Sequence, residues 1–190
     1  WIYSDHGQLA TQPYSVVRGK TLQNVVLDLY ENTSDDSGPP PQLHAGIESQ
    51  RSTTLGGGMA QRLLPELGLE DYLLESQLPA VAGKGPVAHI YWPTKLSTEL
   101  LHQLCARLTQ QEQVPLVFFL DESDGVLAWS EHGCYRLPED KAAIFGEDHP
   151  FLAELAEDWM QLCRHPEAGT FIASGWHRAG KSVSFVTENG

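Results

Sequence analysis

The stretch Val114-Pro115-Leu116-Val117-Phe118-Phe119-Leu120 is an unbroken run of Val, Leu and Phe with a single Pro. A run of this length without a polar position is typical of a strand that is buried on both faces. Turn-forming residues follow at 121–125, and the segments 126–130 and 134–137 are expected to form a hairpin around Glu131-His132-Gly133. The sequence therefore predicts a sheet in which at least one strand is covered on both sides.

Helical and strand patterns alternate on either side of this run. Leu22, Val25, Val26 and Leu29 follow helical spacing and predict a helix over 21–30. Ser97 is a candidate N-cap for a second helix with Leu residues down to Leu108, and 150–163 has a strong apolar face. Further strands are expected at 87–92, 170–174 and 183–187. This order indicates an α/β fold, or an α+β fold with a mixed sheet.

Residues 1–190 are expected to form a single partial domain. The sequence starts with the strand-like Trp1-Ile2-Tyr3 and ends soon after the alternating segment 183–187. We therefore expect a fragment from within a longer protein; the alternative is a complete domain with closely trimmed ends. The Pro-, Ser- and Asp-rich segment 32–42 cannot bury apolar surface, and it is predicted to be an exposed loop.

Composition and charge exclude several classes of partner. The chain has 12 Lys and Arg against 25 Asp and Glu, a formal net charge of −13. Because nucleic-acid binding draws much of its affinity from cations that neutralise phosphates, a polymeric nucleic-acid partner is not expected. No apolar run reaches the roughly 18 residues that a membrane-spanning helix needs. Three cysteines without CxxC spacing provide neither a disulfide framework nor a zinc knuckle.

The tripeptide Asp5-His6-Gly7 is the first candidate for chemistry. It follows a strand-like segment, and open α/β folds build their sites at strand ends. A carboxylate beside an imidazole supplies two ligands suited to Zn²⁺ or Mn²⁺, and Gly7 would let the backbone turn so that both converge on one ion. The alternative is that Asp5 caps a turn and His6 is an ordinary surface residue.

The segment Gly175-Trp176-His177-Arg178-Ala179-Gly180-Lys181-Ser182 matches the phosphate-binding pattern GxxxxGK[ST]. A phosphate-binding loop requires a helix that begins at the Lys-Ser pair. The β-patterned segment 183–187 follows instead, so the sequence favours a hairpin tip between two strands.

The other histidines and the cysteines form no catalytic pattern in the sequence. His102 is expected to be solvated on its helix, and His132 and His177 are expected at turns. There is no HExxH spacing and no GxSxG elbow, and no cysteine has a neighbouring base in the sequence. Serine or cysteine nucleophilic catalysis therefore has no support.

The string Trp1-Ile2-Tyr3-Ser4-Asp5-His6-Gly7-Gln8 resembles the strand-Ser-Asp-His-Gly signature of the alkaline phosphatase superfamily. The closer resemblance is to its type I phosphodiesterase/nucleotide pyrophosphatase branch. Segments 85–92 and 117–163 resemble later elements of these proteins, and 183–190 resembles the stretch before the last metal-binding histidine of the family. The resemblance implies a sandwich with a mixed, mostly parallel central sheet and flanking helices, of which this chain is the C-terminal portion.

The resemblance implies a metal-dependent phosphoric ester hydrolase, with in-line attack on phosphorus assisted by two divalent ions. Asp5 and His6 would bind one ion; Zn²⁺ is expected, with Mn²⁺ as the second candidate. The nucleophile and upstream ligands would precede Trp1, and the last histidine would follow Gly190, so the 190 residues alone are expected to be inactive. The implied substrate is a small phosphate ester. The alternatives are a non-catalytic or degenerate binding domain and, less supported, a nucleotide binder that uses Gly175–Ser182.

Overall fold

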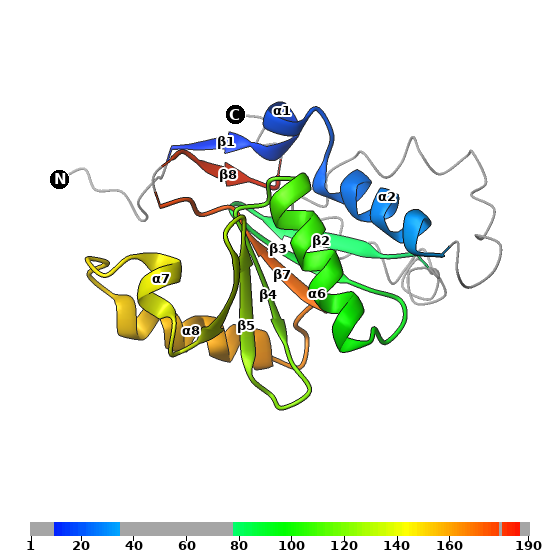
Figure 1. Ribbon diagram of the computed structural model, residues 1–190. Helices are drawn as coiled ribbons and strands as arrows, with labels where there is room; N and C mark the ends of the chain where they lie inside the picture. Colours follow the sequence, from blue (N-terminus) through cyan, green and yellow to red (C-terminus); the bar gives the residue numbers. More distant parts are fainter. Residues whose placement is uncertain (1–9, 35–77, 179, 187–190) are drawn as a thin grey trace, which may run out of the picture.

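A computed structural model describes residues 10–34, 78–178 and 180–186 (Figure 1). The helices are α1 (Tyr14–Arg18), α2 (Leu22–Ser34), α6 (Thr98–Ala106), α7 (Lys141–Phe145) and α8 (Leu152–Arg164), and the π-helical turn η1 (Arg107–Gln111) continues α6. The strands are β1 (Thr11–Pro13), β2 (Ala80–Lys84), β3 (Val87–Tyr91), β4 (Leu116–Leu120), β5 (Val126–Ser130), β6 (Gly133–Leu137), β7 (Phe171–Ser174) and β8 (Ser182–Ser184).

The strands form two sheets of opposite character. The larger sheet has six strands in the order β2-β3-β7-β4-β5-β6, and every neighbouring pair is antiparallel. The smaller sheet pairs β1 with β8 in parallel. The mixture of helices and strands is confirmed. The mostly parallel central sheet is not found in the part of the chain that the structure describes.

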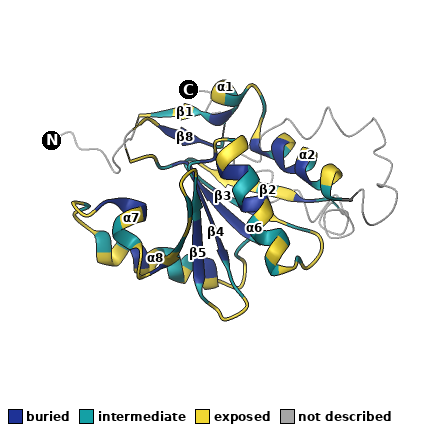
Figure 2. Cartoon of the chain, in the orientation of Figure 1, coloured by how far each residue is buried: buried dark blue, intermediate teal, exposed yellow. Residues whose placement is uncertain are grey.

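The β4 strand is buried on both faces although its sheet is antiparallel, and this explains why its apolar run did not predict the strand direction. Strand β4 directs Val117 and Phe119 toward one apolar cluster, with α2, α6 and η1, and Leu116 and Phe118 toward another, with α7 and α8. Figure 2 shows the dark blue strands between these helix layers. An unbroken apolar run thus indicates that both faces of the strand are covered. Here helices cover both faces of an antiparallel sheet. The run carries no information about the direction of the neighbouring strands.

Most predicted elements are present, with different ends. Ser97 is confirmed as an N-cap, because its side chain accepts a hydrogen bond from the Leu100 amide at 3.3 Å. The hairpin of β5 and β6 is confirmed, with Ser130 opposite Gly133. Helix α2 extends to Ser34, into the predicted loop 32–42, and in its last turn the Thr33 hydroxyl donates to the Leu29 carbonyl at 2.6 Å. The remainder of that loop, 35–42, lies outside the described residues.

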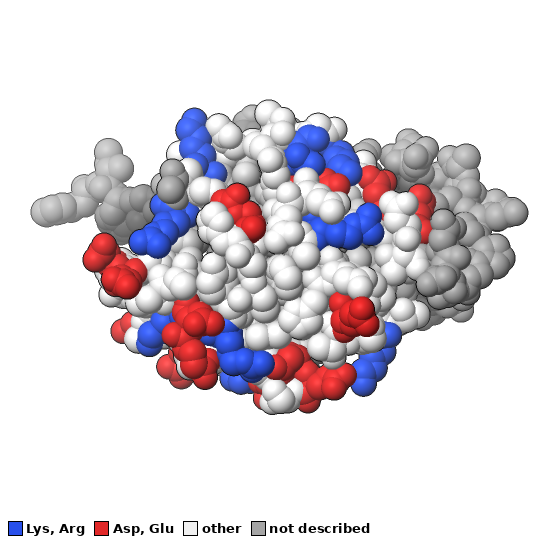
Figure 3. All heavy atoms as spheres, in the orientation of Figure 1, with Lys and Arg blue, Asp and Glu red and all other residues white. Residues whose placement is uncertain are grey.

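The surface in Figure 3 carries both signs of charge. On this face, Lys and Arg side chains are interspersed with Asp and Glu. Several form ion pairs, such as Arg18 with Glu112 at 3.1 Å and Arg136 with Asp121 at 2.7 Å. This arrangement differs from the clustered cations that bind a phosphate backbone. In the three described ranges, no helix is both long and apolar enough to cross a membrane.

Candidate functional site

The predicted metal ligands Asp5 and His6 lie outside the described residues, so their geometry stays a prediction. The nearest described strand, β1, begins five positions after His6. It pairs in parallel with β8, with Thr11 opposite Ser182 and Pro13 opposite Ser184. Figure 1 shows the blue β1 beside the red β8. The fold thus brings a segment close in sequence to the motif against a segment close to residue 190.

Strand β8 and the residue after it also bond to the β2–β3 turn and to the residue that follows β7. The Val183 amide donates to the Gly175 carbonyl at 2.8 Å, and the Phe185 amide donates to the Gly85 carbonyl at 2.9 Å. The Ser184 hydroxyl is buried and also contacts the Gly85 carbonyl, at 3.3 Å. These bonds join the parallel pair to the six-stranded sheet, because buried backbone groups require partners.

The phosphate-binding pattern at Gly175–Ser182 does not have the structure that its function requires. Ser182 begins strand β8, where a phosphate-binding loop needs the first turn of a helix. The predicted hairpin tip is also wrong: β7 pairs with β3 and β4, whereas β8 pairs with β1. The segment is instead a connection between the two sheets.

Gly175→Ala is expected to lower the free energy of unfolding by about 3 kcal/mol. An added Cβ would overlap the Val183 carbonyl oxygen, next to the amide that holds β8. Urea denaturation followed by circular dichroism measures the loss. Gly83→Ala is the matched control, since its Cβ would meet the Phe185 Cβ at an ordinary 3.4 Å. Equal stabilities of the two variants would contradict the close approach of these backbones.

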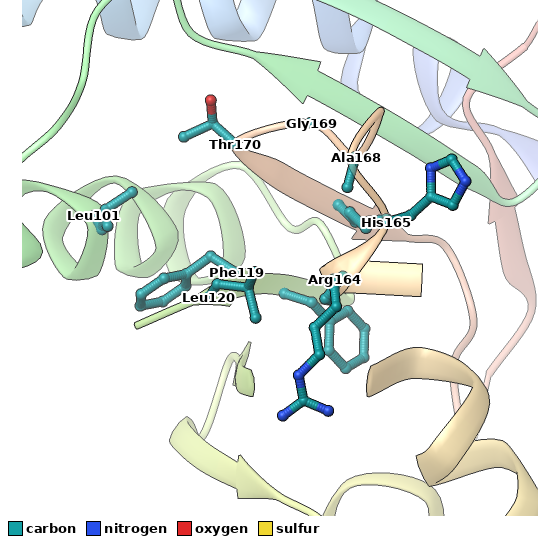
Figure 4. Close-up of a pocket in the computed structure, with 11 residues that line it drawn as sticks. Leu101, Phe119, Leu120, Arg164, His165, Ala168, Gly169 and Thr170 are labelled. Carbon is teal, nitrogen blue, oxygen red and sulfur yellow. The ribbon is translucent and has the colours of Figure 1, made fainter. Parts of the chain in front are cut away.

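Two adjoining hollows lie at one edge of the six-stranded sheet, where β3 and β4 end and β7 begins. Their volumes are about 330 and 670 Å³, and Leu101, Leu120 and Thr170 line both. Figure 4 shows Leu101 of α6 on one side, Arg164 at the end of α8 on the other, and Phe119 and Leu120 between them. We call this combined space the strand-end hollow.

The strand-end hollow has an apolar floor and a polar rim. Its rim carries Lys95, Thr98, Glu122 and Arg164. Thr98 donates to Glu122 at 2.8 Å, and Arg164 donates to the Asp124 side chain and carbonyl at 3.2 and 2.9 Å. The hollow thus combines apolar side chains with polar side chains that already bond to one another or to the neighbouring turn.

Asp121 lines the same space, but its carboxylate is already satisfied. It accepts hydrogen bonds from Ser123, from the Gly125 amide at 2.7 Å and from Arg136 at 2.7 Å. The bonds from Ser123 and Arg136, with that from the Gly125 amide, hold the pKa of Asp121 well below its usual range. A carboxylate with so low a pKa is a poor general base, so its role here is to shape the turn between β4 and β5.

Three histidines of the described chain accept hydrogen bonds at Nδ1 in or beside the strand-end hollow: His89, His102 and His165. His102 is not simply solvated: its Nδ1 accepts from the Trp129 indole at 3.2 Å, and its ring packs edge-on against Phe119. His89 Nδ1 accepts from the Gly169 amide at 3.1 Å, and His165 Nδ1 from the Glu167 amide at 3.2 Å. Residues 10–34, 78–178 and 180–186 bring together no group of three or more His, Cys, Asp or Glu suited to a metal ion.

The cysteines of the described chain lie in environments that disfavour ionisation of their thiols. Cys105 and Cys163 are buried, and burial raises the pKa of Cys163 to about 12. Cys134 is exposed on β6, and partial desolvation raises the pKa of its thiol as well. A raised pKa keeps a thiol protonated near neutral pH, and the thiolate is the reactive form.

The strand-end hollow was missed in the sequence. Lys95 and Thr98 follow β3, Asp121 and Glu122 follow β4, and Thr170 precedes β7. Polar residues just beyond the predicted strands are the sequence signal for this site. The order of the strands in the sheet is also needed to show that these residues lie close together.

Comparison of the chain with protein-family models, with curated proteins and with solved structures finds no match.

Proposed function

We propose that this chain forms part of a metal-dependent phosphoric ester hydrolase of the phosphodiesterase/nucleotide pyrophosphatase type, in which Asp5 and His6 bind one of two divalent ions. The sequence Ser4-Asp5-His6-Gly7 carries the proposal. The pairing of β1 with β8 supports it. The site implied by the resemblance needs ligands from both ends of this sequence, and that pairing brings flanking segments together.

The donor chemistry of Asp5 and His6 fits the proposed ion. A carboxylate oxygen and an imidazole nitrogen are ordinary ligands of Zn²⁺, and Mn²⁺ accepts the same pair. Two bound divalent ions would supply electrostatic stabilisation of the attacking and leaving oxygens at phosphorus. Asp5 and His6 hold and orient ligand atoms, and the nucleophile and the other ligands are assigned to sequence beyond residues 1–190.

We also assign β1 and β8 to the parallel central sheet of an alkaline-phosphatase-like sandwich. Each strand has only three residues, and a sheet of two such strands is marginal without further strands or packing. Strand β8 is buried at all its positions, as strands of parallel sheets are. In this proposal the antiparallel six-stranded sheet lies beside the catalytic sheet.

The substrate class follows from charge as well as from the resemblance. A net charge of −13 repels a long polyanion, whereas metal ions set the local charge at a small site. We therefore propose a small phosphate ester as the substrate.

Removing metal from the intact protein is the direct test. The protein that contains residues 1–190 with its flanking sequence is expected to hydrolyse bis(p-nitrophenyl) phosphate or p-nitrophenyl phosphate. Treatment with EDTA is expected to lower this rate by about a hundredfold or more, and added Zn²⁺ or Mn²⁺ to restore it, because the ions stabilise the transition state. Release of p-nitrophenolate measures the rate, and residues 1–190 alone are expected to be inactive.

Two results would overturn the proposal. Hydrolysis that persists at the full rate after chelation would exclude a metal-dependent reaction. An intact protein that binds no Zn²⁺ or Mn²⁺ and hydrolyses neither ester would instead support the non-catalytic or degenerate binding domain. Metal content by mass spectrometry, measured on the same samples, separates the two results.

A further inference from the structure

The segment that joins α8 to β7 forms one wall of the strand-end hollow. Residues 165–170, which we call the joining segment, follow α8 directly and lead into β7. His165, Ala168, Gly169 and Thr170 line the hollow. In Figure 4 the joining segment crosses above Phe119 and Leu120, and the His165 and Arg164 side chains point in different directions.

Two imidazoles hold backbone amides of the joining segment. Gly169 N–H donates to Nδ1 of His89 at 3.1 Å, and Glu167 N–H donates to Nδ1 of His165 at 3.2 Å. His89 lies on β3 and His165 within the segment itself. An imidazole nitrogen accepts a hydrogen bond only while it is unprotonated. Both bonds therefore require neutral histidines with the proton on Nε2.

Protonation reverses the role of each Nδ1. The imidazolium carries a proton on both ring nitrogens, so Nδ1–H would face the amide N–H that it had bound. The contact then changes from attraction to repulsion between two donors. Because burial lowers the pKa of His89, this change at His89 requires a pH below the ordinary histidine value of about 6.5.

The remaining bonds of the joining segment do not depend on histidine protonation. The Tyr91 hydroxyl donates to the Glu167 carbonyl at 3.0 Å, and Thr170 Oγ1 accepts from the Trp92 amide at 3.1 Å. An added Cβ at Gly169 would lie 2.7 Å from the Ile90 carbonyl oxygen, so the segment lies tightly against β3. Acid should therefore release the Gly169 amide, while the bonds from Tyr91 and Trp92 keep the segment against β3.

We propose that the joining segment is an acid-released latch on the strand-end hollow, closed by His89 when its imidazole is neutral and loosened when that imidazole is protonated. Because the segment lines the hollow between α6 and the end of α8, its loosening would change one wall of the hollow. The latch does not depend on the proposed hydrolase function, because its residues and its bonds are separate from Asp5 and His6.

The surroundings of His89 favour its neutral form. Across the sheet it lies opposite Ala82 of β2 and Ile172 of β7, which are both apolar, and its ring stacks against Tyr91. Burial, followed by the nearby charge of His165, lowers the pKa of His89. Arg164 and Glu167 flank His165 in the sequence, and in the described chain no carboxylate forms an ion pair with His89.

The direction of the pH dependence follows from this lowered pKa. The closed latch binds fewer protons than the loosened one, in which His89 regains an ordinary pKa near 6.5. The closed form is thus fully stabilised above about pH 6.5, and the stabilisation is lost as the pH falls through the lowered pKa.

Amide hydrogen exchange measured by NMR tests the latch. Protection factors, which remove the intrinsic pH dependence of exchange, are compared at about pH 7.5 and about pH 4.5, well below the ordinary histidine value of about 6.5. The Gly169 amide is expected to lose protection about five- to tenfold at the lower pH, the effect of one lost hydrogen bond. The Phe118 amide of β4 reports on global unfolding and should keep its protection.

Substitutions at His89 separate the latch from general loosening. In His89→Asn the side-chain oxygen can accept the Gly169 amide without titrating, so protection should be the same at both pH values. In His89→Leu no acceptor remains, and protection should be low at both. His132→Asn is the matched control, since His132 is exposed at the hairpin of β5 and β6, and it should behave as the wild type.

Two outcomes would overturn the latch. One is a wild-type Gly169 amide whose protection changes less than about twofold between the two pH values, which is below the effect of a lost hydrogen bond. The other is a His89→Asn variant that keeps the full pH dependence. If His89→Asn does not fold, the titration of His89 in the wild type is followed by NMR through its ring resonances. The Gly169 amide signal must then change over the same pH range as the His89 ring.

Discussion

Asp5→Asn and His6→Ala are each expected to reduce the hydrolysis of small phosphate esters about a thousandfold in the intact protein. Each substitution removes a ligand from the proposed metal pair, and a bound ion contributes several kcal/mol to stabilising charge in the transition state. The rate with bis(p-nitrophenyl) phosphate and the zinc content of each variant are the measurements. Both should fall together.

His132→Ala is the control for this experiment. His132 is also a histidine beside a carboxylate, with Nε2 at 3.6 Å from Glu131, but it is exposed at the tip of the β5–β6 hairpin. Its replacement should leave the rate and the metal content unchanged. Full activity of both Asp5→Asn and His6→Ala would end the assignment, provided that the wild-type protein is active.

The sequence located the proposed metal ligands and missed the strand-end hollow for one reason. Asp5 and His6 are neighbours in the chain, so their combination is visible as a motif. The hollow combines residues after β3, after β4 and before β7, which meet only because β7 inserts between β3 and β4. No local pattern encodes that insertion, since it depends on the packing of α6 and α8 on opposite faces.

The elements were more predictable than their connections. Apolar periodicity identified α2, α6 and α8, and the unbroken run identified β4, because these patterns record local burial. Strand direction and the separate β1–β8 pair were not predictable. The short elements β1, α1, β2 and α7 have too few residues to establish a period, and the Gly-containing β2 is exposed at most positions. At Gly175–Ser182 the sequence correctly disfavoured a phosphate-binding loop, but the predicted hairpin was wrong because the pairing partners of β7 and β8 are distant in the sequence.

Phe118→Ala is expected to lower the free energy of unfolding by about 3–5 kcal/mol. Phe118 has an exposed fraction of 0% at the middle of β4, and its ring stacks on Trp159 of α8 with centroids 4.1 Å apart. Phe145 of α7 lies 6.4 Å away on the same side of the sheet. The substitution removes one of three packed aromatic rings and leaves a cavity beside Trp159 of α8 and Phe145 of α7. A loss of this size is a large part of the free energy of unfolding of a small domain.

Phe151→Ala is the matched control, because its side chain is 63% exposed before α8. Its loss should stay within about 0.5 kcal/mol, as for most surface substitutions. Urea denaturation of both variants, followed by far-ultraviolet circular dichroism, gives the two free energies. A loss below about 1 kcal/mol for Phe118→Ala would mean that α8 does not pack on this face of β4. The β4 strand would then not be covered by helices on both faces. The end of α8 would also not form a wall of the strand-end hollow.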